Sequence, residues 1–105
     1  MEKFYYTISE VSELLEETPT VVRYWSNTFS KYVKPHRNGK GNRLYQSEDV
    51  EALKQIRYLV REKKMKLSGV ENKLKEERSS VDRSVKALDS LKEIRNQLVE
   101  IRKNL

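Results

Sequence analysis

The chain has 105 residues, of which 36% are hydrophobic, so it has room for one small domain and an appendage but not for a large buried catalytic cavity. It contains no cysteine, which excludes disulfides, thiolate metal sites and cysteine-based redox sensing. It has no apolar run of about 18 residues and no signal-peptide core, so we expect a cytoplasmic protein.

The net charge of +6 is concentrated in one segment of the chain. Residues 18–47 contain six basic side chains and no acidic one, whereas the other 75 residues carry 16 of each sign. The six are Arg23, Lys31, Lys34, Arg37, Lys40 and Arg43. Because this segment has no carboxylate that would repel a polyanion, we predict that it binds a polyanion such as nucleic acid.

Two short helices are predicted before and at the start of the acid-free segment. Thr7 and Glu10 have the spacing of a capping box, and an apolar face follows them. Thr18 and Pro19 then give a second N-cap, with proline at the first helical position. The predicted apolar faces are Ile8, Val11, Leu14 and Leu15, then Val22, Trp25 and Phe29. Two helices joined by so few residues form a helix-turn-helix.

The second helix is the predicted recognition helix. Thr20, Arg23 and Tyr24 lie on faces away from Val22 and Trp25. Arginine can contact a guanine edge or a phosphate, threonine can contact a thymine methyl, and tyrosine can hydrogen-bond to the backbone. An ordinary solvated helix face, with Tyr24 half packed, is the alternative.

Residues 30–46 lose the helical period, and we predict a two-stranded hairpin there, the wing. Pro35, Gly39 and Gly41 interrupt the helix, and residues 43–45 have strand character. The glycines permit positive φ at the tip, and Asn42 tolerates it. Lys40 belongs to the same tip and presents charge to phosphates.

The strand alternation of the wing places Arg43 and Tyr45 on one face. Arg43 is therefore predicted to present charge to phosphates, while the Tyr45 ring packs and its hydroxyl points outward. The other interpretation is a flexible basic turn whose Tyr45 belongs to the core.

A third and a fourth helix are predicted after the wing. Ser47 is the expected N-cap of the third, with Glu48 and Asp49 in its first turn. Residues 63–67 break it, and Ser68 is expected to cap a short fourth helix. The core-facing positions are Val50, Leu53, Ile56, Val60, Val70 and Leu74. A second basic cluster, either phosphate-contacting or placed for the helix dipole, consists of Arg57, Arg61, Lys63, Lys64 and Lys66.

Residues 76–105 form the last predicted helix, whose narrow apolar stripe requires a partner helix. A heptad frame places Ser84, Leu91, Leu98 and Leu105 at one core position, and Ala87, Ile94 and Ile101 at the other. Val81, Val85 and Leu88 fit a frame shifted by three residues, so we expect a change of register near residue 88.

No constellation for catalysis occurs in the sequence. His36 is the only histidine and has no second histidine or cysteine with which to share a metal. No nucleophile and base pair and no glycine-rich phosphate loop are present. We therefore predict a protein that is not an enzyme and that uses no cofactor and no metal.

The order of these motifs resembles the MerR family of bacterial transcription regulators. The matching runs are residues 6–10, Arg23-Tyr24-Trp25, Gly41-Asn42-Arg43-Leu44-Tyr45 and Glu48-Asp49-Val50. Two departures are Ser26, where the family usually has an acid, and the longer loop before Pro35, which lacks its usual glycine. The resemblance implies a mainly α fold: a winged helix-turn-helix of four short helices and a two-stranded wing in residues 1–75, then a coiled-coil dimerisation helix in residues 76–105.

The resemblance also implies a homodimer with an antiparallel coiled coil, which binds double-stranded DNA at a near-palindromic promoter operator. The second helix would enter the major groove, and the wing would follow the backbone. We expect a nucleoid-associated location, RNA polymerase as a further partner and no effector domain. The expected DNA-binding residues are Thr20, Arg23, Tyr24, Lys40, Asn42, Arg43 and Tyr45. The expected dimerisation residues are Leu88, Leu91, Ile94, Leu98, Ile101 and Leu105.

Two other functions fit the same sequence features. An architectural or recombination-accessory protein would bend DNA without changing promoter output. A coiled-coil adaptor would bind another protein through its last helix and keep the winged part as a scaffold. Bending and transcription assays separate the first from a regulator, and the oligomeric state bears on the second.

Overall fold

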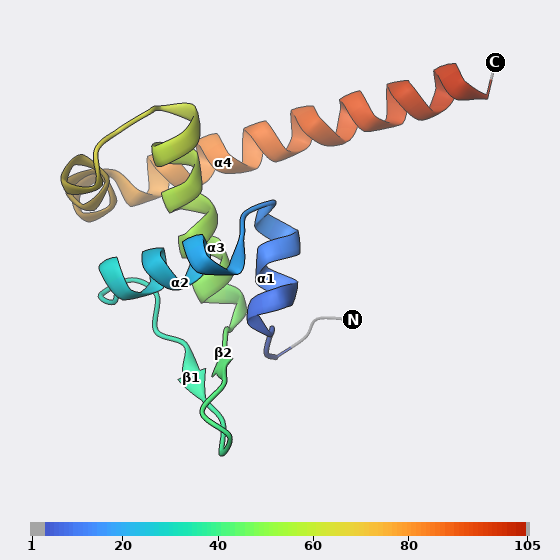
Figure 1. The fold of residues 1–105 in the computed structure, drawn as a ribbon. Helices are drawn as coiled ribbons and strands as arrows, with labels where there is room; N and C mark the ends of the chain where they lie inside the picture. Colours follow the sequence, from blue (N-terminus) through green and yellow to red (C-terminus); the bar gives the residue numbers. More distant parts are fainter. Residues whose placement is uncertain (1–3, 105) are drawn as a thin grey trace.

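The computed structural model describes residues 4–104, and it confirms the predicted fold class: mainly helical, with a small two-stranded sheet and a long C-terminal helix (Figure 1). The elements are α1 (Ile8–Leu15), α2 (Pro19–Thr28), β1 (His36–Arg37), β2 (Arg43–Leu44), α3 (Ser47–Arg57), the π-helix η1 (Tyr58–Glu62) and α4 (Leu67–Lys103). Within the described residues, no helix is both long enough and apolar enough to span a bilayer.

Helices α1 and α2 begin where the capping chemistry predicts. The Glu10 amide donates to Thr7 Oγ1 at 3.2 Å, and the Thr7 amide donates to Glu10 Oε1 at 3.1 Å. Thr18 Oγ1 accepts from the Val21 amide at 3.3 Å and places Pro19 at the first helical position. Between the helices, Glu16 adopts a left-handed conformation with φ 56°, which ends α1 and makes the turn short.

The wing is the antiparallel pair β1 and β2, in which His36 faces Leu44 and Arg37 faces Arg43. Its base is tied to the start of the chain, because Tyr6 and Tyr45 exchange two backbone hydrogen bonds of 2.7 and 2.8 Å. Figure 1 shows the wing extending from the side of the domain opposite to α4. The wing is therefore free to contact a ligand while α4 contacts something else.

Helix α3 begins at Ser47, and the prediction that Ser47 is its N-cap is wrong, because Gln46 occupies that position. The Asp49 carboxylate accepts hydrogen bonds from the backbone N–H of Gln46 at 2.9 Å and from the backbone N–H of Lys34 at 2.8 Å. Asp49 is buried, so one carboxylate both starts α3 and fixes the connection that leads into the wing. The sequence pattern identified the helix start correctly but not the residue that caps it.

The 37 residues of α4 consist of two helices that meet at a kink, which confirms the predicted short fourth helix followed by a separate long one. It starts at Leu67 after Lys66, so the predicted Ser68 cap is also wrong. A kink at Glu77, with φ −132° and ψ 33°, divides it near the predicted boundary at residue 75. In Figure 1 the first turns are seen nearly end-on, and the remainder crosses the top of the domain and projects beyond it.

The core lies between α1, α2, α3, η1 and both parts of α4, and it contains most of the predicted apolar positions. The prediction that Leu14 faces the core is wrong, because 51% of this residue is exposed, and Ile8 and Val60 are only partly buried. Its buried members are Val11, Leu15, Val22, Trp25, Phe29, Val33, Tyr45, Val50, Ala52, Leu53, Ile56, Leu59, Val70, Leu74, Val81 and Val85. Because Val81 and Val85 of α4 pack on the same domain, the helix is anchored well past its kink.

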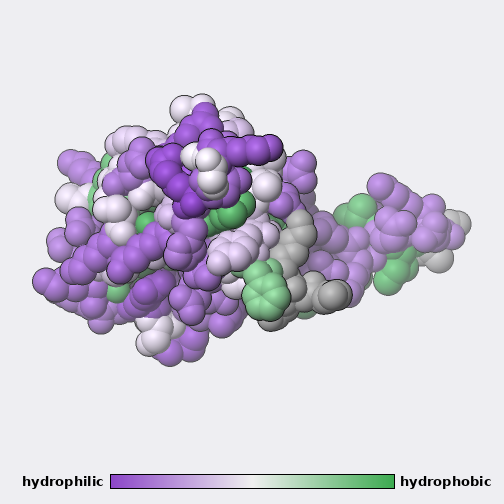
Figure 2. Space-filling view, turned by 90° about the horizontal axis from the view of Figure 1, so that it is seen from below, coloured by the Kyte–Doolittle hydropathy of each residue, from purple (hydrophilic) through white to green (hydrophobic). Residues whose placement is uncertain are grey.

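Beyond that anchored part, the apolar stripe of α4 faces solvent. The exposed fractions are 63% for Leu91, 54% for Ile94, 57% for Leu98 and 58% for Ile101. Figure 2 shows separate hydrophobic patches on the part of the molecule that projects from the domain. The change of frame expected near residue 88 thus separates side chains that pack within the chain from side chains left uncovered.

Candidate nucleic-acid interface

The outer face of α2 carries the side chains predicted for base and backbone contacts. Thr20, Arg23 and Tyr24 are exposed, with 54% of Tyr24 accessible, whereas Val22 and Trp25 are buried. This division follows from the helical period, since residues two positions apart lie on opposite faces. The exposed face is therefore available to a groove of DNA, while the buried face holds the helix on the domain.

Arg43 of the wing is half-buried and contacts α2. Its Nη2 donates to Oδ1 of Asn27 at 2.8 Å, and its Nη1 is buried without a hydrogen-bond partner among the described residues. Asn27 lies in the last turn of α2 and is exposed. The hydrogen bond joins the wing to the end of the recognition helix, a contact that the sequence pattern did not indicate.

Tyr45 shares a face with Arg43, as predicted, but the expectation that its hydroxyl points outward is wrong. The residue is fully buried, and its hydroxyl lies 3.0 Å from Ser26 Oγ. Ser26 Oγ donates its only hydrogen to the Val22 carbonyl at 2.7 Å, so the Tyr45 hydroxyl must be the donor to Ser26. Tyr45 thus serves the core and is removed from the candidate DNA contacts.

The wing tip is organised by Asn38, which was not singled out in the sequence. Its Oδ1 accepts hydrogen bonds from the backbone N–H of Lys40 at 2.9 Å and from the backbone N–H of Asn42 at 3.0 Å. Gly41 is the tip residue that has positive φ, +80°, so only one of the two predicted glycines uses that freedom. Lys40 and Asn42 are both exposed, as their proposed contact with DNA requires.

A cleft of about 460 Å³ separates α2 and the start of α1 from the wing. None of the described residues that line it carries a carboxylate, and three carry a guanidinium: Arg23 from α2, Arg37 from β1 and Arg43 from β2. In the described part of the chain, every ion pair joins residues outside 18–47. Among residues 4–104, no carboxylate therefore forms an ion pair with the basic side chains of the acid-free segment.

The second basic cluster behaves differently, because two of its arginines are paired within the chain. Glu17 accepts from Arg57 Nε at 3.0 Å and from Arg61 Nε and Nη2 at 3.1 and 2.9 Å. The Arg61 guanidinium also lies 5.6 Å from the centre of the Trp25 ring. Burial alone would raise the pKa of Glu17, but hydrogen bonds and charge from Arg61 and Arg57 hold this pKa below its ordinary value of 4.5.

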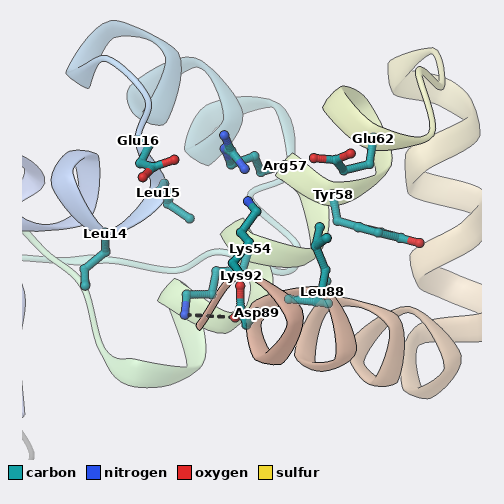
Figure 3. Close-up of a pocket in the computed structure, with 11 residues that line it drawn as sticks. Leu14, Leu15, Glu16, Lys54, Arg57, Tyr58, Glu62, Leu88, Asp89 and Lys92 are labelled. Carbon is teal, nitrogen blue, oxygen red and sulfur yellow. Dashed lines mark ion pairs between the residues drawn. The ribbon is translucent and has the colours of Figure 1, made fainter. Parts of the chain in front are cut away.

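A second hollow, of about 180 Å³, lies between α1, α3, η1 and α4 and has a mixed lining (Figure 3). It contains Leu14 and Leu88 beside Lys54 and Asp89, whose Nζ and Oδ2 are 3.6 Å apart. Its acidic groups make it a poor site for DNA. Leu88, expected in the dimerisation stripe, is half-buried here against its own domain, and Leu105 lies outside the described residues.

Sequence reasoning missed three side chains at the interface: Asn27, Arg37 and Asn38. Asn38 precedes a glycine, which is a turn signal that could have identified it. Arg37 was counted among the charges, but its place in the cleft depends on its pairing with β2. Asn27 carries no local signal, because its partner Arg43 is 16 residues away in sequence.

The family model for MerR helix-turn-helix regulatory proteins matches residues 6–77, which is more than half of the chain and includes both sides of the cleft. The chain belongs to the MerR family. Family membership supports a role in DNA-binding transcription regulation, and it agrees with an exposed recognition face and an acid-free wing on one domain.

Individual relatives of this MerR-family chain are distant. The regulator protein TubY of Clostridium botulinum C phage is 25% identical over 85 residues, which are 81% of this chain and 35% of that protein. The chain thus spans about a third of the length of this curated relative.

Two solved MerR-family transcriptional regulators have the same fold. The one from Bacillus cereus has a TM-score of 0.59 and 21% identity, over 94% of this chain and 78% of that chain. The one from Bacillus thuringiensis has a TM-score of 0.54 and 20% identity, over 95% of this chain and 96% of that one.

Proposed function

We propose that this protein is a dimeric, sequence-specific regulator that binds double-stranded DNA at a near-palindromic operator in a promoter. In each protomer α2 enters the major groove and the wing lies along the phosphate backbone. The observation that carries the proposal is the interface described above, where an exposed recognition face and the acid-free wing border one cleft, and no described residue in the lining of that cleft is acidic.

The side chains of this interface have different roles in the proposal. Arg23 and Thr20 contact base edges, and Tyr24 contacts a backbone oxygen. Lys40 and Asn42 at the wing tip contact phosphates or sugars, which positions the protein without reading sequence. Arg43, half-buried beside α2, supplies charge near the backbone from a fixed position.

The homodimer is proposed from the exposed stripe of α4. Leu91, Ile94, Leu98 and Ile101 follow the 3- and 4-residue spacing of a coiled-coil seam, and all four are more than half exposed in one chain. A helix in water gains nothing from such a stripe, whereas pairing with a second copy removes it from water. The antiparallel arrangement follows the resemblance to the family.

Binding to an operator would place the protein on the nucleoid, with RNA polymerase at the same promoter as a further partner. Whether the protein activates or represses that promoter can be measured directly. In vitro transcription from a promoter that contains the selected site, beside a DNA-bending assay, separates a regulator from a protein that only bends DNA.

The decisive experiment selects bound duplexes from a random pool and measures their affinity at several salt concentrations. Neutralised phosphates release counterions, so the logarithm of the association constant should fall linearly with the logarithm of salt, by about 0.9 per phosphate contact. Enrichment of a near-palindrome is also expected. A pool without enrichment, or an affinity independent of salt, would refute the proposal.

A further inference from the structure

A hollow of about 440 Å³ lies where η1 and the loop after it meet α4. Part of its lining is apolar: Leu59 and Val81 are buried, and Met65 is partly buried. Small-molecule sites typically have volumes of about 300–1,000 Å³, an apolar lining and a few polar groups. In Figure 1, η1 and α4 lie on the side of the domain opposite to the wing, and this hollow shares no lining residue with the cleft of the nucleic-acid interface.

The polar side chains of this hollow carry ammonium or hydroxyl groups. Lys63 and Lys73 supply the two ammonium groups, and the hydroxyl groups come from Tyr58, Ser80 and Ser84. None of the described residues in the lining carries a carboxylate. Hydrogen-bond donors and positive charge beside an apolar surface are complementary to a small molecule that has an anionic group and an apolar body.

The backbone beside the hollow is unusual at two neighbouring places. Residues Tyr58–Glu62 form a π-helix, and Lys64 has φ 53°, in the left-handed region. A π-helix and a left-handed residue other than glycine are both uncommon, and both occur preferentially at functional sites. Lys63 lies between the two, so this irregular backbone sets the position of one of the two lining lysines.

The other lining lysine, Lys73, is paired with the residue at which α4 is kinked. Its Nζ donates to Oε2 of Glu77, one turn further along the helix. Glu77 has φ −132° and ψ 33°, so the pair spans the kink. The two side chains are 38% and 51% exposed, and ion pairs so open to water contribute little to stability. Another carboxylate can therefore replace Glu77 at Lys73 with little loss of stability.

We propose that this hollow binds a small organic carboxylate, whose charged group replaces Glu77 at Lys73 and whose apolar body lies on the apolar part of the lining. Because Glu77 is the kink residue, this exchange acts on the angle between the first part of α4 and the part that carries the exposed stripe. In the proposed dimer, that angle sets the spacing of the two recognition helices. The regulatory consequence rests on the proposed function, whereas the binding site does not.

The test titrates octanoate and benzoate into the full isotope-labelled chain and follows its backbone amide signals by NMR. Either probe should shift the signals of Lys63, Met65, Ser80 and Ser84 at concentrations that leave residues 91–101 of the exposed stripe unchanged. Acetate lacks the apolar body and octanol lacks the charge, so each should bind at least about tenfold more weakly than octanoate.

Two pairs of nearby residues provide matched variants, because one member of each pair lines the hollow and the other is exposed outside its lining. Lys73→Gln should weaken octanoate binding about tenfold, and Lys75→Gln by less than about twofold. Ser80→Phe places a ring in the hollow and should weaken binding at least about tenfold, whereas Ser79→Phe should not. Both serines are exposed helix positions, so both phenylalanine variants should fold.

The outcomes separate the site from its regulatory role. If neither probe shifts the signals of the lining residues, or if Ser80→Phe binds octanoate as tightly as Ser79→Phe, the site is refuted. Saturating octanoate should change the affinity for a selected operator at least about fivefold in the natural chain and not in Ser80→Phe. An unchanged affinity would refute the regulatory role and leave the site standing. If the natural chain selects no duplex at all, the DNA-binding function fails, while octanoate binding is still measurable.

Discussion

Tyr45 donates its hydroxyl hydrogen to Ser26 Oγ across 3.0 Å, and through this bond the base of the wing is held on the buried side of the recognition helix. One residue further along α2, Asn27 holds Arg43. Two consecutive side chains of α2 therefore accept from two alternate side chains at the end of the wing. Helix and wing should move on DNA as one body.

This pair predicts an asymmetric response to mutation. Ser26→Ala leaves the Tyr45 hydroxyl buried without a partner and should cost about 1–3 kcal/mol of unfolding free energy, while Tyr45→Phe should cost only about 1 kcal/mol. The double variant should cost less than the sum of the two. Urea denaturation of the four proteins measures all these terms.

The same variants test whether Tyr45 contacts DNA. Because its hydroxyl is buried, folded Tyr45→Phe should bind the selected operator within about twofold of the natural chain. A large loss of affinity with intact stability would show that the wing rearranges on DNA and exposes Tyr45.

The ion pairs of Glu17 predict acid sensitivity. A carboxyl whose pKa is lowered on folding stabilises the protein above its unfolded value, and this contribution disappears as pH falls through the folded pKa. Glu17→Gln should therefore lower the unfolding free energy by about 1–3 kcal/mol near neutral pH. The difference from the natural chain should shrink as the pH falls below 4.5. Thermal or urea unfolding from about pH 3 to pH 7 measures it, and a difference that does not change with pH would contradict the assignment.

The exposed stripe predicts that one substitution can separate the protomers. Leu98→Asp places a charge in the proposed seam and should raise the dimer dissociation constant at least about tenfold. Asn96→Asp adds the same charge on the opposite face of the helix and should leave the dimer intact. Sedimentation equilibrium measures both, and equal effects, or a monomeric natural chain, would argue against the seam.

The two wing glycines form a matched pair for a backbone test. Gly41 has φ +80°, and an alanine there should be strained by about 1 kcal/mol. Gly39 has open space around its Cα and no positive φ, so Gly39→Ala should be neutral or slightly stabilising. Hydrogen exchange of the Asn42 amide, which is bonded to Asn38, reports on the wing directly. Faster exchange is expected for the Gly41 variant alone.

The features that were predictable from the sequence depend on interactions between residues that are close together along the chain. The caps at Thr7 and Thr18 each act three residues away, and both were predicted correctly. The buried faces of α1 and α2 follow the helical period. The heptad frame and its shift near residue 88 also follow local spacing. The sequence did not predict that Val81 and Val85, which come before the shift, pack on the domain of their own chain.

The features that were not predictable depend on residues brought together by the fold. Strand alternation correctly predicted the face on which Tyr45 lies but not that its hydroxyl is buried. The hydroxyl is buried against Ser26, which is 19 positions earlier in the sequence. Glu17 pairs with arginines 40 and 44 residues away, which the cluster of basic residues by itself could not reveal. Charge counting identified the acid-free segment, yet only the pairing of β1 with β2 placed Arg37 in the cleft.

Because the heptad frame changes in α4, the apolar side chains before and after the change stabilise the protein in different ways. Val81 and Val85 pack within the chain, so damage there would lower the melting temperature equally at every protein concentration. Leu91, Ile94, Leu98 and Ile101 can be covered only from outside, so their contribution grows with concentration. Substitutions after residue 90 could therefore change the choice of partner, between identical and related chains, and leave the folding of the domain untouched.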